Sequence, residues 1–202
     1  MSFEFAESAL LALVVLLILG FLFWLSNLVF VVRKSEMRCE VDHRLNTAYQ
    51  TWRERISSNG EVSPVSCPQE FDEGETCFAY EYLAFLYEPL KPHGSDKPEM
   101  PVFDSACGEP VDEGWSILDC FEGVNFIGKG FLFVTNRNLY LKGLREIKIP
   151  LGDLQVVATS CSNFLVEAKT MDRPVIFTRV NGQKLRDTVY MLLEKRVNVP
   201  RD

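Results

Sequence analysis

The fold of the larger part of this chain is decided by residues 128–141, which read GKGFLFVTNRNLYL. Phe131 and Phe133 alternate with Leu132 and Val134, and this period of two is typical of a strand that buries one face. The polar residues 135–137 follow as a turn, and a second apolar run then begins. Two short strands joined by a polar turn predict an antiparallel hairpin.

Short aromatic and β-branched runs, separated by turn residues, continue on both sides of this hairpin. The strands that they predict are 76–87, 115–120, 130–135, 138–142, 146–149, 154–159, 164–169 and 175–178. Asn181 is a good N-cap, and Leu185, Val189, Leu192 and Leu193 follow it at helical spacing, so a C-terminal helix is expected. The whole pattern predicts a mainly β domain, a small antiparallel barrel or sandwich with the helix plugging its open end.

Proline marks the breaks in this pattern. Pro64 and Pro68 indicate a linker over residues 61–70, ahead of a domain that spans 71–195 and a tail of 196–202. Residues 89–110 hold five prolines and two glycines in an otherwise polar stretch. This segment is expected to be a long loop or insertion within the domain.

An apolar run near the N-terminus predicts a membrane anchor. Residues 9–32 contain no charged side chain and are long enough, as a helix, to cross the ~30 Å hydrocarbon layer. The eight residues before the run carry only Glu4 and Glu7, whereas three basic residues follow it by position 38. The positive-inside rule therefore places the N-terminus outside and the bulk of the chain in the cytoplasm. The expected location is the cell membrane, as for a bacterial inner-membrane protein, with an uncleaved anchor because the flank is acidic.

The segment after the anchor, residues 33–60, is predicted to be an amphipathic helix. Its apolar residues recur at intervals of three and four, and they are Met37, Val41, Leu45, Ala48, Trp52 and Ile56. Such a stripe either pairs with the same helix of a neighbouring protomer or folds back on the domain that follows. The residues alone leave both alternatives open.

Composition excludes some classes of function. The chain has 28 acidic and 21 basic residues, which is a poor match for a nucleic-acid partner. Its six cysteines are irregularly spaced and show no metal signature, so we expect reduced thiols packed as small hydrophobes, with no metal or cofactor.

The order of these elements resembles the pleckstrin-homology-like superfamily, in its GRAM and bacterial PH-like branches. The resemblance rests on the acidic element 71–75 (FDEGE), on the hairpin phrase 128–141, and on the segment 149–154 (IPLGDL), which precedes two strands and the terminal helix. It covers roughly residues 71–193. An ion pair between Arg137 and Asp153 would tie the hairpin turn to the later strand.

The resemblance implies a recognition module for phosphoinositides, peptides or neighbouring subunits. The leading hypothesis is a single-pass, membrane-anchored scaffold, sensor or assembly subunit that is not an enzyme and whose domain binds a protein partner or its own copies. Its contact would be an exposed strand edge or the acidic aromatic segment 81–88. The candidate partner-binding residues are Trp52, Glu81, Tyr82 and Tyr87.

Two alternatives remain. A lipid headgroup, phosphoinositide or another anionic lipid, would need a rim of converging cations, for which the candidates are Lys129, Arg137, Lys142, Arg145 and Lys148. A membrane-tethered cysteine hydrolase would use Cys107 or Cys120 with His93 as the base. One histidine in a proline-bounded loop is slender support for that chemistry, so no catalytic residue is predicted.

Overall fold

A single unbroken helix, α1 (Ser2–Asn59), begins the chain in the computed structural model, which describes residues 2–90 and 116–194. The chain divides into two units, Met1–Glu40 and Val41–Asp202, so α1 contributes to both. In the first unit residues 13–32 are all exposed, and the helix there is long and apolar enough to cross a membrane by length and composition.

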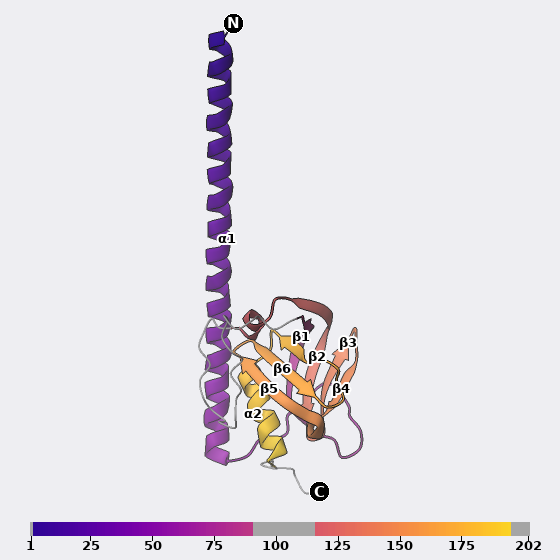
Figure 1. Ribbon diagram of the computed structural model, residues 1–202. Coiled ribbons are helices and arrows are strands. Elements are labelled where there is room, and N and C mark those ends of the chain that lie inside the picture. The colour runs from indigo at the N-terminus through magenta and orange to yellow at the C-terminus, as the bar shows by residue number, and fades with distance from the viewer. Residues whose placement is uncertain (1, 91–115, 195–202) are drawn as a thin grey trace. The chain divides into compact units, whose positions relative to one another are not determined.

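The second unit is built on one open antiparallel sheet of seven strands, in the order β4-β3-β2-β1-β7-β6-β5. Its strands are β1 (Cys77–Pro89), β2 (Val124–Thr135), β3 (Asn138–Gly143), β4 (Ile147–Pro150), β5 (Leu154–Ser160), β6 (Asn163–Ala168) and β7 (Val175–Thr178). Two short 3₁₀ helices, η1 (Ile117–Cys120) and η2 (Leu151–Asp153), lie between strands, and helix α2 (Gly182–Leu193) ends the described chain (Figure 1). This is the expected order of a long helix, a run of antiparallel strands and a C-terminal helix.

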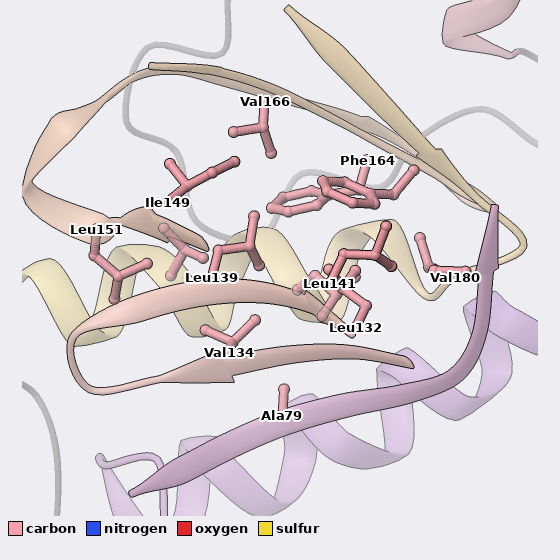
Figure 2. Close-up of a cluster of buried hydrophobic side chains, with 14 of the residues drawn as sticks. Ala79, Leu132, Val134, Leu139, Leu141, Ile149, Leu151, Phe164, Val166 and Val180 are labelled. Carbon is pink, nitrogen blue, oxygen red and sulfur yellow. The ribbon is translucent and has the colours of Figure 1, made fainter. Parts of the chain in front are cut away.

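The main core lies inside the curve of this sheet. Leu132, Leu139 and Leu141 of β2 and β3 point toward Phe164 and Val166 of β6, which reach the core from the opposite side (Figure 2). The apolar side of α2 closes the cluster through Leu185, Val189 and Leu192. Of the two phases of the alternation in β2, Leu132 and Val134 face this core, whereas Phe133 is buried in a second cluster.

Two devices bend the sheet around that core. In β1 the pairing with β2 shifts register at three places, and such bulges increase the local bend and twist of a strand. Where β2 crosses β3, Gly130 and Gly143 face each other so closely that a Cβ at Gly130 would lie 2.3 Å from the carbonyl oxygen of Lys142. Only glycine fits this approach.

The last turns of α1 belong to the second unit and pack against its core. Tyr49 is fully buried, and Trp52 and Ile56 lie against the main core. Of the predicted apolar stripe, Met37 and Val41 are exposed, and so is Ala48. Of the two alternatives for this helix, the structure shows the one in which it folds onto the domain.

One strand prediction is wrong. Residues 117–120 form the 3₁₀ helix η1, because Ser116 accepts a hydrogen bond from the backbone N–H of Leu118 at 3.3 Å and caps a turn. Trp115 and residues 91–110 of the predicted proline-rich loop lie outside the described residues, as do His93 and Cys107.

The expected Arg137–Asp153 ion pair does not occur. The Arg137 side chain turns the other way and donates from Nη1 to the backbone oxygen of Glu73 at 3.4 Å, beside Gly74. The turn is tied instead through the backbone, since Leu151 N–H donates to the Arg137 oxygen at 2.8 Å. Leu151 begins η2, which leads into β5, so this backbone bond connects the hairpin turn to the start of β5.

Candidate binding face on strands β1 and β2

Six aromatic residues gather on the outer side of β1 and β2, the side away from the main core. We call this set the aromatic face, and its members are Tyr80, Tyr82, Phe85 and Tyr87 of β1 with Phe126 and Phe131 of β2. Tyr82 is 65% exposed, Phe126 55% and Phe131 41%. Contiguous exposed aromatic surface of this kind marks an interaction site more often than a random surface does.

The rings of the aromatic face hold one another in place. Tyr82 meets Phe131 edge to face with the ring centroids 6.1 Å apart, and Tyr80 meets Tyr82 in the same way at 5.2 Å. Phe126 contacts Phe85 at 6.3 Å and Tyr87 at 5.6 Å. Aromatic side chains have few rotatable bonds, so a pre-packed group of them loses little entropy on binding.

The parts of the outer side that flank the aromatic face are covered by the chain itself. On one side Val65, Cys67 and Phe71, from the segment before β1, pack on Cys77, Phe133 and Tyr140. On the other side η1 and Phe121 cover Ala158, Leu165 and Ile176. Between these two covers, no residue of the described ranges 2–90 and 116–194 buries Tyr82 or Phe131.

Basic side chains adjoin the aromatic face. The Arg179 guanidinium lies 4.7 Å from the Phe85 ring centroid, and Arg179 has φ of 61°, a left-handed conformation that non-glycine residues rarely adopt. Lys129 pairs with Phe85 in the β1–β2 ladder, and Lys142 pairs with Phe131 across β2 and β3. The face therefore combines exposed rings with positive charge in a chain whose net charge is −7.

The basic residues of the predicted cationic rim lie in separate parts of the sheet. Lys142 and Lys148 both lie over the Tyr140 ring, at 5.4 and 5.2 Å from its centroid, beside a hollow of about 380 Å³. Asp72 forms an ion pair with Lys148 at 3.3 Å, which offsets part of the positive charge of the two lysines. Arg145 lies against Gly128, and Arg137 sits in the hairpin turn at the other end of β2 and β3. These cations do not converge on one headgroup site.

A carboxylate supports the covered end of the sheet. Glu75 accepts hydrogen bonds from the hydroxyls of Thr135 and Tyr140 and from the Asn138 amide. Partial burial by itself raises the pKa of Glu75, but these hydrogen bonds outweigh it and hold the pKa below its ordinary value. Glu75 is thus an ionised anchor for the strands that carry the aromatic face.

The predicted partner-binding residues fall in two places. Tyr82 and Tyr87 belong to the aromatic face. Glu81 points to the opposite side of β1, where it accepts a long hydrogen bond of 3.4 Å from Asn181 N–H and where burial raises its pKa. Trp52 and Glu81 together line a second hollow of about 400 Å³ near the start of α2.

Four members of the aromatic face are not among the candidate residues predicted from the sequence: Tyr80, Phe85, Phe126 and Phe131. Of these, Phe85 lies within the predicted contact segment 81–88. The sequence does contain a signal for this face. In β1 and β2 large apolar residues occupy both phases of the alternation, whereas a strand with one solvent-exposed side usually has polar residues in one phase. Among the described residues, no group of three or more His, Cys, Asp and Glu side chains is arranged to hold a metal ion. Cys120, the last residue of η1, is buried in the cluster that η1 forms with Ala158, Leu165 and Ile176.

The chain matches no model of a known protein family, and it matches no curated protein.

Proposed function

We propose that this chain is a membrane-anchored scaffold or assembly subunit whose PH-like domain binds a protein partner through the aromatic face. The single observation that carries the proposal is the exposed, pre-packed ring pair Tyr82 and Phe131. Tyrosine and phenylalanine are enriched where proteins meet, and buried rings of this kind supply most of the binding energy.

The anchor rests on the first unit of the chain. The long apolar part of α1 supports a single membrane span, and the basic residues that follow residue 32 support a cytoplasmic placement of the domain. The seven antiparallel strands followed by one helix on the core support the PH-like assignment, since this is the order of elements that the resemblance implies.

The chemistry of the face points to the kind of partner. Exposed rings need apolar side chains to cover them, and the adjoining Arg179, Lys129 and Lys142 need anionic groups. The partner segment that fits is therefore apolar at its centre and acidic at its flanks. An acidic segment belonging to a second copy of this chain is included in that description.

The proposal can be tested by photo-crosslinking in native membranes. A benzophenone amino acid placed at Tyr82 or at Phe131 of the full-length chain should form an adduct with one protein at a defined stoichiometry. The same probe at Leu144, which is 77% exposed and lies in the β3–β4 turn, is the matched control. Replacement of both face residues by serine should abolish co-purification of the same protein, whereas Leu144→Ser should not.

The outcomes separate the alternatives. Adducts between two copies of this chain would assign the acidic segment to the chain itself. Adducts with lipid alone, or protein adducts no stronger than those from Leu144, would contradict the proposal. Lipid adducts that disappear when Lys142 and Lys148 are both replaced would favour a headgroup site instead.

A further inference from the structure

Two cysteine side chains from different segments lie in one apolar cluster beside the aromatic face. Cys67 comes from the segment before β1, and Cys77 is the first residue of β1. The backbone N–H of Val65 donates to the oxygen of Cys77 at 2.9 Å, which holds the two segments side by side. Both cysteines belong to the cluster around Phe133 and Tyr140. The Cys67 thiol donates to the backbone oxygen of Gln69 at 3.4 Å, and the Cys77 thiol donates to that of Ala79 at 3.3 Å.

The environments of the two thiols differ. Cys67 is half-buried, so solvent reaches it, whereas Cys77 is buried. Burial, together with the neighbouring Cys67 thiol, raises the pKa of Cys77 to about 12. A thiol in that state reacts poorly with reagents from solution. The pair therefore has one sulfur that an oxidant can reach and one that is protected from it.

We propose that Cys67 and Cys77 form a reversible disulfide, which makes this pair a redox modification site. The geometry favours it because both side chains pack into one cluster, from two backbone segments that the Val65–Cys77 hydrogen bond holds side by side, and a disulfide needs backbones that lie this close. It is an addition to the partner proposal and does not depend on it.

The chemistry balances with a peroxide as the oxidant. The Cys67 thiol gives up its proton and attacks one oxygen of hydrogen peroxide, which breaks the O–O bond, releases water and leaves a sulfenic acid on Cys67. The Cys77 sulfur then attacks the Cys67 sulfur, the S–O bond breaks, and the departing hydroxide takes the Cys77 proton to form a second water. Two thiols are oxidised and one peroxide is reduced; a dithiol reductant reverses the result.

The disulfide would restrain the segment before β1, which covers Phe133 and Tyr140 on the outer side of the sheet. It would close a ring over residues 67–77, and Phe71 lies within that ring with its own ring 5.5 Å from Phe133. The segment that covers Phe133 and Tyr140 would then be covalently fixed to β1, next to Tyr80 of the aromatic face. Oxidation should therefore reduce the motion of that cover.

The test uses the full-length chain in detergent, reduced, freed of reductant and treated with hydrogen peroxide. Remaining thiols are blocked with N-ethylmaleimide before the chain is unfolded and digested without reduction. An endopeptidase that cleaves after glutamate separates the two cysteines, because Glu70, Glu73 and Glu75 lie between them. Mass spectrometry should then find their two peptides joined, with a mass lower by two hydrogen atoms, and dithiothreitol should separate them.

Matched variants make the result specific. Cys39→Ser removes an exposed thiol on α1 and should leave the joined peptides unchanged. Cys67→Ser should abolish them and leave Cys77 open to alkylation after unfolding. In Cys77→Ala the sulfenic acid on Cys67 has no resolving thiol, so dimedone should label Cys67 more strongly than in the wild-type chain.

The proposal is overturned if peroxide leaves both thiols open to alkylation, or oxidises Cys67 beyond the sulfenic acid without joining it to Cys77. It is equally overturned if Cys67 joins Cys39 of another molecule as readily as it joins Cys77. Since Cys67 is only half-buried, the Cys67→Ser variant keeps the test informative even if Cys77→Ala fails to fold. A pair already joined in unstressed cells would support the site and contradict the cytoplasmic placement of the domain.

Discussion

Replacing Tyr49 by phenylalanine should destabilise the second unit by about 2 kcal/mol. The Tyr49 hydroxyl donates to Oδ2 of Asp187, and both side chains are buried between the last turns of α1 and helix α2. A hydrogen bond to a charged group contributes about 1.5–3 kcal/mol. The change removes no apolar surface, and Asp187 keeps its bond of 2.8 Å from Nε of Arg186, so the larger cost of an unpaired buried charge does not apply.

The measurement is urea unfolding of the full-length chain in micelles, followed by tryptophan fluorescence. Trp52 stacks on Tyr49 with the ring centroids 6.0 Å apart, so its emission reports on this part of the unit. At a slope of about 2 kcal/mol/M the midpoint should fall by about 1 M. Burial, and then the bond to Asp187, raises the pKa of Tyr49, so the hydroxyl remains a donor at neutral pH.

Tyr82→Phe is the matched control, because it removes a hydroxyl from an exposed ring, and that hydroxyl lies 3.3 Å from the exposed hydroxyl of Tyr80. Its stability should stay within about 0.5 kcal/mol of the wild-type chain. If Tyr49→Phe behaves like this control, the hydroxyl contributes nothing to holding α1 on the domain, and the reasoning is refuted. A larger loss in Tyr49→Phe, with an unchanged slope, supports it.

Three further changes test the interior. Because the pKa of Glu75 is lowered, its carboxylate stabilises the fold above pH 4.5, and this stabilisation is lost as the pH falls toward the folded-state pKa. Glu75→Gln should therefore weaken the loss of stability at acid pH in urea titrations. The raised pKa of Glu81 has the opposite sign, so stability falls as the pH rises above 4.5, and Glu81→Gln should gain stability at pH 7 but not at pH 4. Gly130→Ala, whose Cβ would meet the Lys142 oxygen, should cost about 3 kcal/mol in thermal or urea unfolding, whereas Gly152→Ala, with no atom within 4 Å, should be near neutral.

The elements that follow a local rule were predictable from the sequence. The alternation of residues 131–134 identified the hairpin, and the Asn181 cap located the start of α2. The 3₁₀ helix η1 was mistaken for a strand because its six-residue window is short, apolar and ambiguous between the two periods. The hydrogen bond that Ser116 accepts from Leu118 favours the 3₁₀ helix over a strand. A single serine in the sequence is too weak a signal to predict that cap.

Tertiary contacts account for the other differences. The buried side of the last turns of α1 is set by Tyr49, which finds a carboxylate on α2 that is 138 residues away in sequence. No periodicity within the helix contains that information, so the predicted stripe included Ala48, which is exposed. In β1 the register shift between Glu81 and Ala84 decides which side each residue takes. It places Glu81 under the sheet and leaves Tyr82 on the aromatic face.

The geometry also separates the two contacts that the sequence suggested, a strand edge and the aromatic segment of β1. The edge strand β4 has only four residues, carries Lys148, and ends in Pro150, and each of these features discourages the addition of another strand. Side-chain recognition across the sheet needs none of the backbone groups of that edge. Tyr82 and Phe131 present rings that are already packed against each other, with basic groups beside them. On the proposal that a protein partner binds, the aromatic face rather than the β4 edge is therefore where that partner would bury the most apolar surface for the least loss of conformational entropy.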